Sequence, residues 1–215
     1  TSAGDKEEDA VAVDLSLPTP EVGAEAIKEA AASVNELSAK EAKSIFTALR
    51  KAANHPLMLR VRYTDEQVLH KISQVCLIKQ HFGKHCDDLD RVKQELESFS
   101  DFDLHQVCSE YPELQRHTLQ VEALYESPKF GYMQEALPGI VDAGNHVLVF
   151  SQWTRTLDLL ELLMEDLDLA YLRLDGSTAV RERQQLIDKF NTGSFPVFLL
   201  STKAGGLGIN PVSYT

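Results

Sequence analysis

Apolar residues in the C-terminal part of the chain follow two patterns in turn, continuous runs typical of buried strands and spaced positions typical of helices. Strand-length apolar runs and segments with helical spacing follow one another in the order 146–150, 156–167, 170–174, 179–190 and 196–200. Strand, helix, strand, helix and strand with short connections predict parallel pairing through right-handed crossovers. The pattern therefore predicts an α/β fold, a parallel sheet with flanking helices, over residues 127–215.

The middle of the chain shows helical periods and no strand signal. Capping-box spacing at Ser38–Glu41 and again at Thr64–Gln67 predicts two helix starts. Pro56 ends the first of these helices, because proline disfavours helix in the residue before it. We therefore assign residues 37–126 to a mostly helical brace and insert, with a further helix beginning at Ser127-Pro128.

Residues 1–36 carry much of the acidity of the chain. The 215 residues have a formal net charge of −12, and this stretch holds nine acidic and two basic residues. Polar residues 1–18 show no sustained period and predict a disordered linker, whereas the Ala-rich run from Pro20 to Asn35 predicts a helix. We expect an acidic, partly helical linker; the alternative is a segment that competes with DNA for basic surfaces such as those of histones.

Composition narrows the class of protein. Hydrophobic residues make up 43% of the chain, which is enough for a packed core, yet no run approaches the roughly 18 apolar residues of a membrane span. Three cysteines are too few for a disulfide framework. The first methionine is Met58, so we expect that Thr1 is not a native translation start.

Cysteine and histidine residues of the insert raise the question of a metal site. The candidates are Cys76, His81, His85, Cys86, His105 and Cys108. Their spacing matches no paired-ligand zinc pattern. We therefore interpret them as ordinary residues of a helical insert and expect no metal.

Polar clusters follow each of the three predicted strands. In an open α/β sheet, ligands gather at the carboxyl ends of the strands. The clusters contain Ser151 and Gln152; Ser177 and Thr178; and Ser201, Thr202, Lys203, Gly205, Gly206 and Gly208. The glycines let backbone N–H groups approach an anion closely and Lys203 adds positive charge, although the same glycines could merely permit tight turns. Trp153 could stack on a base or sugar, but we favour packing beneath the loop.

Three blocks of sequence resemble motifs of a known family. His146–Thr154 (HVLVFSQWT), Tyr171–Thr178 (YLRLDGST) and Phe198–Asn210 (FLLSTKAGGLGIN) resemble, in order and spacing, the second RecA-like lobe of Swi/Snf-type chromatin-remodelling ATPases of helicase superfamily 2. Ala48–Leu57 and Asp103–Tyr111 are most similar to the DEAD/H-box-containing, SMARCAD-type subgroup. The resemblance covers roughly residues 39–210.

This resemblance implies a fold, a function and partners. The fold is a partial RecA-like helicase C-terminal lobe, and the function is that lobe's part in a nuclear, ATP-dependent DNA translocase acting on nucleosomes. The implied cofactor is ATP with Mg²⁺, and the implied partners are double-stranded DNA, histones and an N-terminal RecA-like lobe. By position, Gly205, Gly206 and Gly208 lie near the nucleotide. The residues implied near DNA phosphates are Ser151, Gln152, Ser177, Thr178, Ser201, Thr202 and Lys203.

Motifs that complete such a motor are not found in this sequence. There is no G-x-x-x-x-G-K-[ST] phosphate loop, and Asp65-Glu66 stands at a predicted helix start rather than in a DExH strand. The family's arginine-bearing motif would lie beyond Asn210, so we expect a lobe truncated after the glycine-rich motif. The chain alone should hydrolyse no ATP. The alternative function is a non-catalytic interaction fragment from a truncated transcript or gene model.

Overall fold

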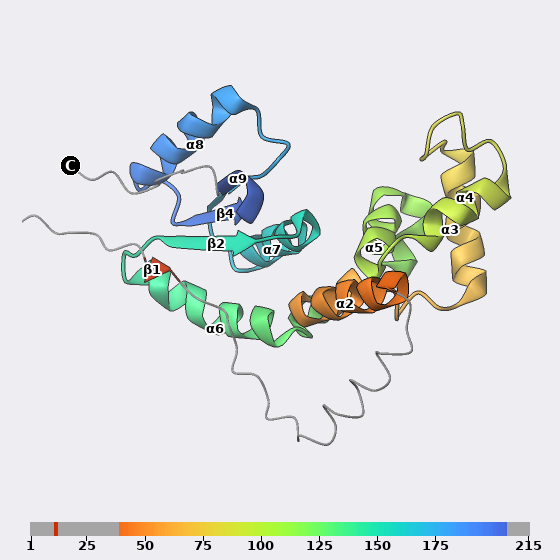
Figure 1. The fold of residues 1–215 in the computed structure, drawn as a ribbon, viewed down its shortest axis with the longest axis horizontal. Coiled ribbons are helices and arrows are strands. Elements are labelled where there is room, and N and C mark those ends of the chain that lie inside the picture. Colours follow the sequence, from red (N-terminus) through yellow and green to blue (C-terminus); the bar gives the residue numbers. More distant parts are fainter. Residues whose placement is uncertain (1–10, 13–38, 206–215) are drawn as a thin grey trace, which may run out of the picture. The chain divides into compact units, whose positions relative to one another are not determined.

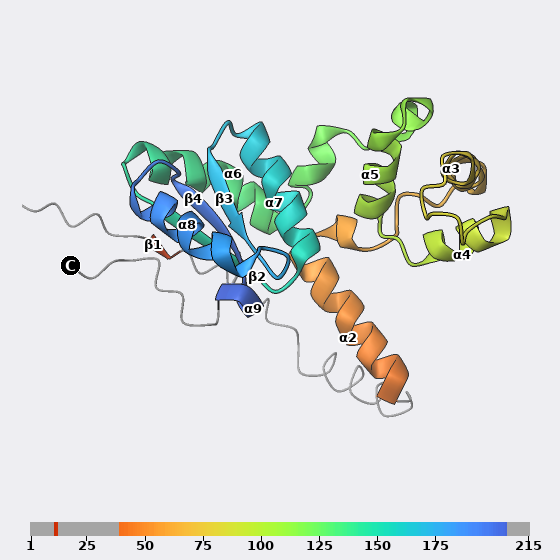
Figure 2. The same ribbon diagram turned by 90° about the horizontal axis from the view of Figure 1, so that it is seen from above.

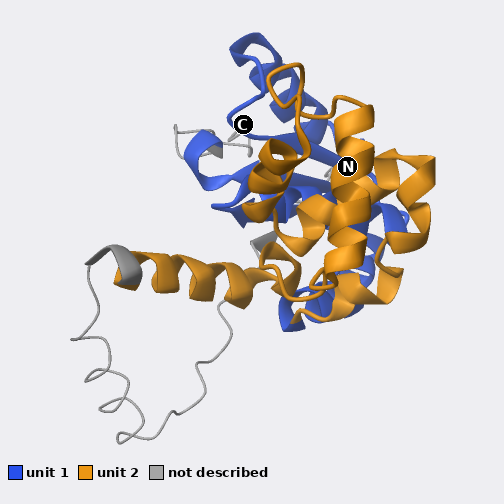
Figure 3. Cartoon of the chain, turned by 90° about the vertical axis from the view of Figure 1, so that its right-hand side faces the viewer, with its two compact units in different colours: residues 1–18, 128–215 blue, residues 19–127 orange. Residues whose placement is uncertain are grey.

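The computed structural model describes residues 11–12 and 39–205, which fall into two compact units. One unit contains residues 128–205 with the dipeptide 11–12, and the other contains residues 39–127, with the division between Ser127 and Pro128 (Figure 3). The predicted insert boundary, at residue 126, lies one residue away. None of the helices in the described ranges is long and apolar enough to cross a membrane.

A parallel sheet forms the centre of the first unit. Its strands are β1 (Val11–Ala12), β2 (Val147–Ser151), β3 (Tyr171–Leu174) and β4 (Val197–Ser201). Their order is β1-β2-β4-β3, with every neighbouring pair parallel. The three strands predicted from the sequence are confirmed, each beginning one residue later than its apolar run. The α/β prediction is therefore correct.

Helices flank this sheet. They are α6 (Pro128–Asp142), α7 (Thr154–Asp166), α8 (Val180–Asn191) and the short α9 (Thr202–Gly205). Helices α6 and α8 lie on opposite sides of the sheet (Figure 1). Ile187 and Phe190 of α8 pack with Leu174, Phe198 and Leu200 of the strands. Central strand β4 is buried along its whole length, as expected for a parallel strand covered on both faces.

One short strand was not predicted. Val11–Ala12 lies in the segment 1–18 that the sequence analysis interpreted as disordered, but these two residues pair with Val147 and Leu148 of β2. Two residues are too few to produce an alternating pattern, which is why the sequence gives no signal. The rest of residues 1–38, including the predicted helix after Pro20 and the Ser38 cap, lies outside the described residues.

The second unit is mainly helical, as predicted. It contains α2 (Ala39–Asn54), α3 (Glu66–Ile78), α4 (Leu89–Glu97), α5 (Asp101–Glu110), and the 3₁₀ turns η1 (Pro56–Met58), η2 (Pro112–His117) and η3 (Val121–Tyr125). Its core joins α3, α4, α5 and η2 through Ile72, Val92, Leu96, Leu104 and Leu114.

Two predicted helix boundaries of this unit can be compared with the structure. Helix α2 ends at Asn54, immediately before the His55-Pro56 pair, as predicted. At the start of α3 the predicted capping residue is wrong: Asp65, not Thr64, is the N-cap, and its carboxylate accepts from the backbone N–H groups of Gln67 and Val68. Asp is as good a cap as Thr, so the sequence alone does not choose between adjacent candidates.

A buried carboxylate holds the chain between η1 and α3. Asp101 is fully buried, and its two oxygens accept hydrogen bonds from the backbone N–H groups of Val61, Arg62 and Tyr63, at 2.9 to 3.1 Å. The backbone N–H of Asp101 donates in turn to the Leu59 carbonyl at 2.7 Å. One side chain therefore satisfies three donors of a loop that belongs to no helix.

Replacing Asp101 by Ala should lower the free energy of unfolding of this unit by about 3 kcal/mol. The backbone N–H groups of Val61, Arg62 and Tyr63 would lose their acceptor, and those of them that are buried would have no other partner. Urea unfolding followed by far-ultraviolet circular dichroism measures the loss. Asp87→Ala, which removes an exposed carboxylate from the same unit, is the matched control and should change stability by less than about 0.5 kcal/mol. Equal effects of the two substitutions would contradict this role of Asp101.

Two histidines of the second unit are held in their neutral form. The Nε2 atom of buried His55 lies 2.9 Å from the Leu124 carbonyl, while its Nδ1 accepts from the Leu57 N–H. Burial lowers the pKa of His55 below 6.5 and outweighs the opposing effect of the Leu124 hydrogen bond. His105 accepts from the Leu119 N–H through Nδ1, and burial lowers its pKa as well.

Stability of this unit should fall as the pH is lowered from neutral through the usual histidine pKa of 6.5. The unfolded chain then takes up protons that the folded unit excludes, and the loss continues until the depressed folded pKa is passed. Unfolding measured across this range should show a weaker pH dependence in His105→Gln. The exposed His70→Gln is the control and should retain the wild-type dependence. Stability that is constant or rises toward low pH would rule this mechanism out.

Candidate functional site

The carboxyl ends of β2, β4 and β3 lie at one edge of the sheet. Ser151 at the end of β2 is the register partner of Ser201 at the end of β4, and Leu174 at the end of β3 is the partner of Leu200. The three strands run side by side toward this edge (Figure 2). The described residues of the three polar clusters predicted from the sequence therefore follow strands that end at one edge, and we call this region the strand-end edge.

Two serines of the strand-end edge face inward and organise the turns. Ser151 is buried, and its hydroxyl accepts from the Trp153 N–H and donates to the Trp153 carbonyl, both at 3.1 Å. Ser201 is also buried, and its hydroxyl accepts from the Ala204 N–H at 3.2 Å. These hydroxyls fix the chain that leads into α7 and α9. Trp153 is itself partly buried.

The loop after β3 is built around one carboxylate. Asp175 is only 4% exposed, and its Oδ1 accepts from the Ser177 N–H at 2.8 Å and from the Ser177 hydroxyl at 2.6 Å. The Asp175 N–H donates to the Thr178 hydroxyl at 3.1 Å. Both predicted site residues of this loop are thus held by Asp175, while Ser177 stays exposed and Thr178 half-exposed.

Arg173 anchors that carboxylate from the strand. Its Nε and Nη2 atoms donate to Oδ2 of Asp175 at 2.9 and 2.7 Å. Its Nη1 donates to Asp158 of α7 at 2.7 Å and to Glu161 one turn further on. The guanidinium therefore links the middle of β3, helix α7 and the loop that carries Ser177.

Arg173 and the carboxylates around it shift one another's pKa values. Burial alone would raise the pKa of Asp175, but the hydrogen bonds from Ser177 and Arg173 outweigh it and lower the pKa. Burial likewise acts to lower the pKa of Arg173, yet the hydrogen bonds to Asp158 and Asp175 and the charge of Glu161 raise it. Both groups are therefore ionised at neutral pH, and the Asp175 charge is compensated within the protein.

The side chains that face solvent at the strand-end edge are neutral or positive. Gln152, Ser177, Thr202 and Lys203 are exposed, and Lys203 and Thr202 lie in the first turn after β4. Gly205 ends α9, whereas Gly206 and Gly208 lie outside the described residues. Asp175 and Arg173 were not among the site residues predicted from the sequence. A basic residue inside an apolar strand, two positions before an acidic one, was the available signal.

No group of three or more histidine, cysteine, aspartate or glutamate side chains in the described part of the chain could hold a metal ion. Three of the cysteine and histidine candidates make contacts within the second unit. Cys76 and Cys108 belong to the core of the second unit, and burial raises the pKa of both thiols, that of Cys76 to about 12. The His81 Nδ1 atom lies 2.8 Å from the Tyr111 hydroxyl.

Comparison with known proteins agrees with this architecture. Residues 129–213 match the family of helicase conserved C-terminal domains. The chain is 42% identical over 163 residues to the ATP-dependent helicase fft2 of Schizosaccharomyces pombe, which covers 75% of this chain and 12% of that protein. It is 39% identical over 181 residues to the ATP-dependent helicase FUN30 of Saccharomyces cerevisiae, covering 83% of this chain and 16% of the relative.

A human relative and a solved structure extend the comparison. The human SWI/SNF-related matrix-associated actin-dependent regulator of chromatin subfamily A containing DEAD/H box 1 is 41% identical over 184 residues, which is 84% of this chain and 18% of that protein. The crystal structure of the C-terminal part of the Fun30 ATPase domain superposes with a TM-score of 0.69 at 37% identity, covering 81% of this chain and 60% of that one.

The fold and these matches identify the sheet unit as a helicase conserved C-terminal domain, preceded by a helical unit. Together the two units correspond to the C-terminal lobe of SWI/SNF-type ATPases. Within that class, the chain belongs to the DEAD/H-box-containing subgroup that includes fft2, FUN30 and the human chromatin regulator. The family resemblance inferred from the three sequence blocks is confirmed. The chain spans less than a fifth of the length of these curated relatives.

Replacing Arg173 by Gln should raise the pKa of Asp175, because the carboxylate loses a cation and two hydrogen bonds while remaining buried. Carboxyl titration by NMR measures this shift directly. Arg155→Gln is the control, because Arg155 is an exposed residue of α7 that forms an ion pair with Asp158. This substitution should leave the titration of Asp175 unchanged. An Asp175 titration insensitive to Arg173→Gln would show that Ser177 alone holds the loop.

Proposed function

We propose that this chain supplies the second-lobe DNA-facing surface and one wall of the ATP cleft of an ATP-dependent chromatin remodeller that translocates on DNA. The observation that carries the proposal is the strand-end edge: three loops of a parallel sheet converge there, in a chain related to proteins named as ATP-dependent helicases and as a regulator of chromatin. Ligands of open α/β sheets bind at such an edge.

The DNA-facing role is supported by the charge and exposure of the edge. Lys203 provides a cation, and Gln152, Ser177 and Thr202 provide exposed polar groups of the kind that contact phosphate oxygens. Such contacts position a duplex without reading its sequence. Ser151, Thr178 and Ser201, whose hydroxyls hydrogen-bond within the loops, act in the proposal by shaping the loops beneath the phosphates.

Asp175 would repel a phosphate if its charge were uncompensated. Arg173 places two donors on the Asp175 carboxylate, and the Asp175 side chain is only 5% exposed, so little negative charge reaches solvent from the loop. An anion can then approach Ser177 without meeting an exposed carboxylate from its own loop.

The nucleotide is assigned to the glycine-rich segment. Gly205, Gly206 and Gly208 are the proposed contacts, because glycine lets backbone N–H groups approach an anion closely. ATP with Mg²⁺, when bound, supplies the phosphoryl group whose hydrolysis drives the motor. The donors of the strand-end edge fit phosphate oxygens better than a metal ion, since the Asp175 carboxylate is already engaged by Arg173 and Ser177.

The remaining parts of the proposal concern the whole protein. Phosphoryl transfer depends on positioning and on compensating charge on the phosphates. The sequence of this chain contains no Walker-type phosphate loop. A first RecA-like lobe is therefore the proposed partner that binds the β- and γ-phosphates, and nucleosomes in the nucleus are the proposed substrate, by relation to the chromatin regulator.

Replacing Lys203 by Gln should lower the salt dependence of duplex binding by the 215-residue chain. The slope of log K against log salt should decrease in magnitude by about 0.9, the value for one phosphate contact. Fluorescence anisotropy with a random-sequence duplex measures the slope, and Lys129→Gln, outside the strand-end edge, is the control.

The chain should hydrolyse no ATP with or without DNA. An unchanged slope, or DNA-stimulated turnover by this chain, would overturn the proposal.

A further inference from the structure

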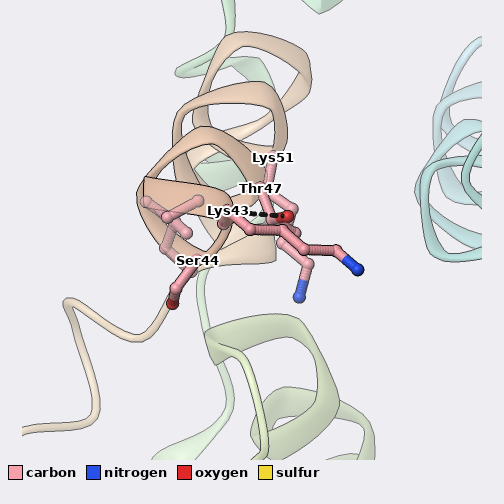
Figure 4. Close-up of a pocket in the computed structure, with 6 residues that line it drawn as sticks. Lys43, Ser44, Thr47 and Lys51 are labelled. Carbon is pink, nitrogen blue, oxygen red and sulfur yellow. Dashed lines mark hydrogen bonds between the residues drawn. The ribbon is translucent and has the colours of Figure 1, made fainter. Parts of the chain in front are cut away.

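Two cavities of the second unit do not identify a ligand. One has a volume of about 410 Å³ and lies beside α2, where Lys43 and Lys51 extend from one side of the helix and Ser44 lies on the other (Figure 4). The second has a volume of about 670 Å³ and is lined by basic and acidic side chains together. The polar groups of the first cavity therefore do not converge, and the charges of the second compensate one another.

Charged side chains do converge in the sheet unit, around Arg173. Its Nε and Nη2 atoms donate to Asp175 in the loop after β3, and its Nη1 atom donates to Asp158 and Glu161 of α7. One guanidinium therefore binds three carboxylates. None of these four side chains is more than 28% exposed, so solvent screens the cluster less than it screens a surface ion pair.

The guanidinium presents different edges to these partners. Its Nε and Nη2 atoms lie 2.9 and 2.7 Å from Oδ2 of Asp175, while Nη1 lies 2.7 Å from Oδ1 of Asp158. A guanidinium is planar, and its N–H donors have fixed directions relative to one another. The carboxylates of α7 therefore set the orientation in which Arg173 meets Asp175.

The two α7 carboxylates lie away from the side chains proposed to contact DNA. Asp158 and Glu161 are three residues apart and so share one face of the helix. Glu161 stands seven residues into α7, roughly 10 Å along its axis from the strand-end edge. A chain of hydrogen bonds nevertheless joins them to Ser177 through Arg173 and Asp175, because the Ser177 hydroxyl donates to Oδ1 of Asp175 at 2.6 Å.

We propose that Asp158 and Glu161 are positioning residues for DNA binding at the strand-end edge. They hold Arg173 against Asp175, and Asp175 in turn holds the loop that carries Ser177. DNA as the ligand rests on the proposed function, whereas the relay rests on these contacts. Without the α7 carboxylates, Nη1 of Arg173 loses its partners and the guanidinium turns away from Asp175. An uncompensated charge then stands beside the proposed phosphate contact, and the Ser177 loop is held less firmly.

The sign of the effect on binding separates positioning from net charge. Removing two negative charges from an acidic chain should strengthen its binding to DNA if charge alone acts. Removing Asp158 and Glu161 should weaken binding if they hold Arg173 in place. Replacing Asp175 by Asn in the same background should then restore binding in part, because the amide keeps an Oδ1 acceptor for Ser177 and carries no charge.

The test measures duplex binding by the 215-residue chain through fluorescence anisotropy with a random-sequence duplex. The α7 double variant, Asp158→Ala/Glu161→Ala, should bind about tenfold more weakly, as expected for one lost hydrogen bond to a charged group. Alanine favours helix, so α7 should stay folded, and circular dichroism checks this. Glu165→Ala is the control, because it removes a carboxylate of α7 that contacts the Tyr171 hydroxyl instead. This control should bind at least as tightly as the wild type.

Carboxyl titration by NMR follows the relay in the absence of DNA. The pKa of Asp175 should rise in the α7 double variant, because the buried carboxylate loses the compensating guanidinium. Glu165→Ala should retain the wild-type titration of Asp175. An unchanged pKa of Asp175 in the double variant would overturn the relay whatever the result with DNA.

The binding outcomes separate the relay from the proposed function. If Lys203→Gln lowers the salt dependence while the α7 double variant binds as tightly as the wild type, the relay is excluded and the DNA-facing function stands. Weaker binding by the double variant that Asp175→Asn restores supports the relay. Weakening that Asp175→Asn does not restore, or that Glu165→Ala shares, shows a general structural effect and overturns it. If neither Lys203→Gln nor the double variant changes duplex binding, both proposals fail.

Discussion

The parallel register of β2, β4 and β3 is the constraint on which the candidate site depends. Parallel strands joined by right-handed crossovers end at the same edge, so polar residues distant in sequence become neighbours. The pairing of Ser151 with Ser201 fixes two of the three loops relative to each other. Strand β4 lies between β2 and β3 and pairs with both of them, so two ladders of hydrogen bonds hold that register.

Buried carboxylates organise both units in the same way. Asp101 accepts from three backbone N–H groups of the loop before α3, and Asp175 accepts from Ser177 and Arg173 in the loop after β3. In each case a buried carboxylate accepts hydrogen bonds from backbone N–H groups of a loop, and these bonds order the loop.

Basic residues of the sheet unit have two different uses. Lys203 faces solvent at the strand-end edge. In the sheet unit, Arg173 is used internally by Asp158, Glu161 and Asp175, and so contributes little to the external field. The proposed contact with DNA at the strand-end edge therefore combines a local cation with exposed polar groups and does not depend on the net charge of the chain.

The amino-acid sequence by itself determined the α/β class, the three longer strands, the end of α2 before His55-Pro56 and the membership of the family, because these follow from periodicity and contiguous motifs. It did not reveal β1, the Asp65 cap, or which site hydroxyls are buried. Only the tertiary structure decided that Ser151 and Ser201 face inward while Gln152 and Lys203 face solvent, and that Arg173 reaches Asp158, Glu161 and Asp175. These features depend on contacts between residues far apart in the chain, and local sequence pattern carries no information on which partner a buried charge finds.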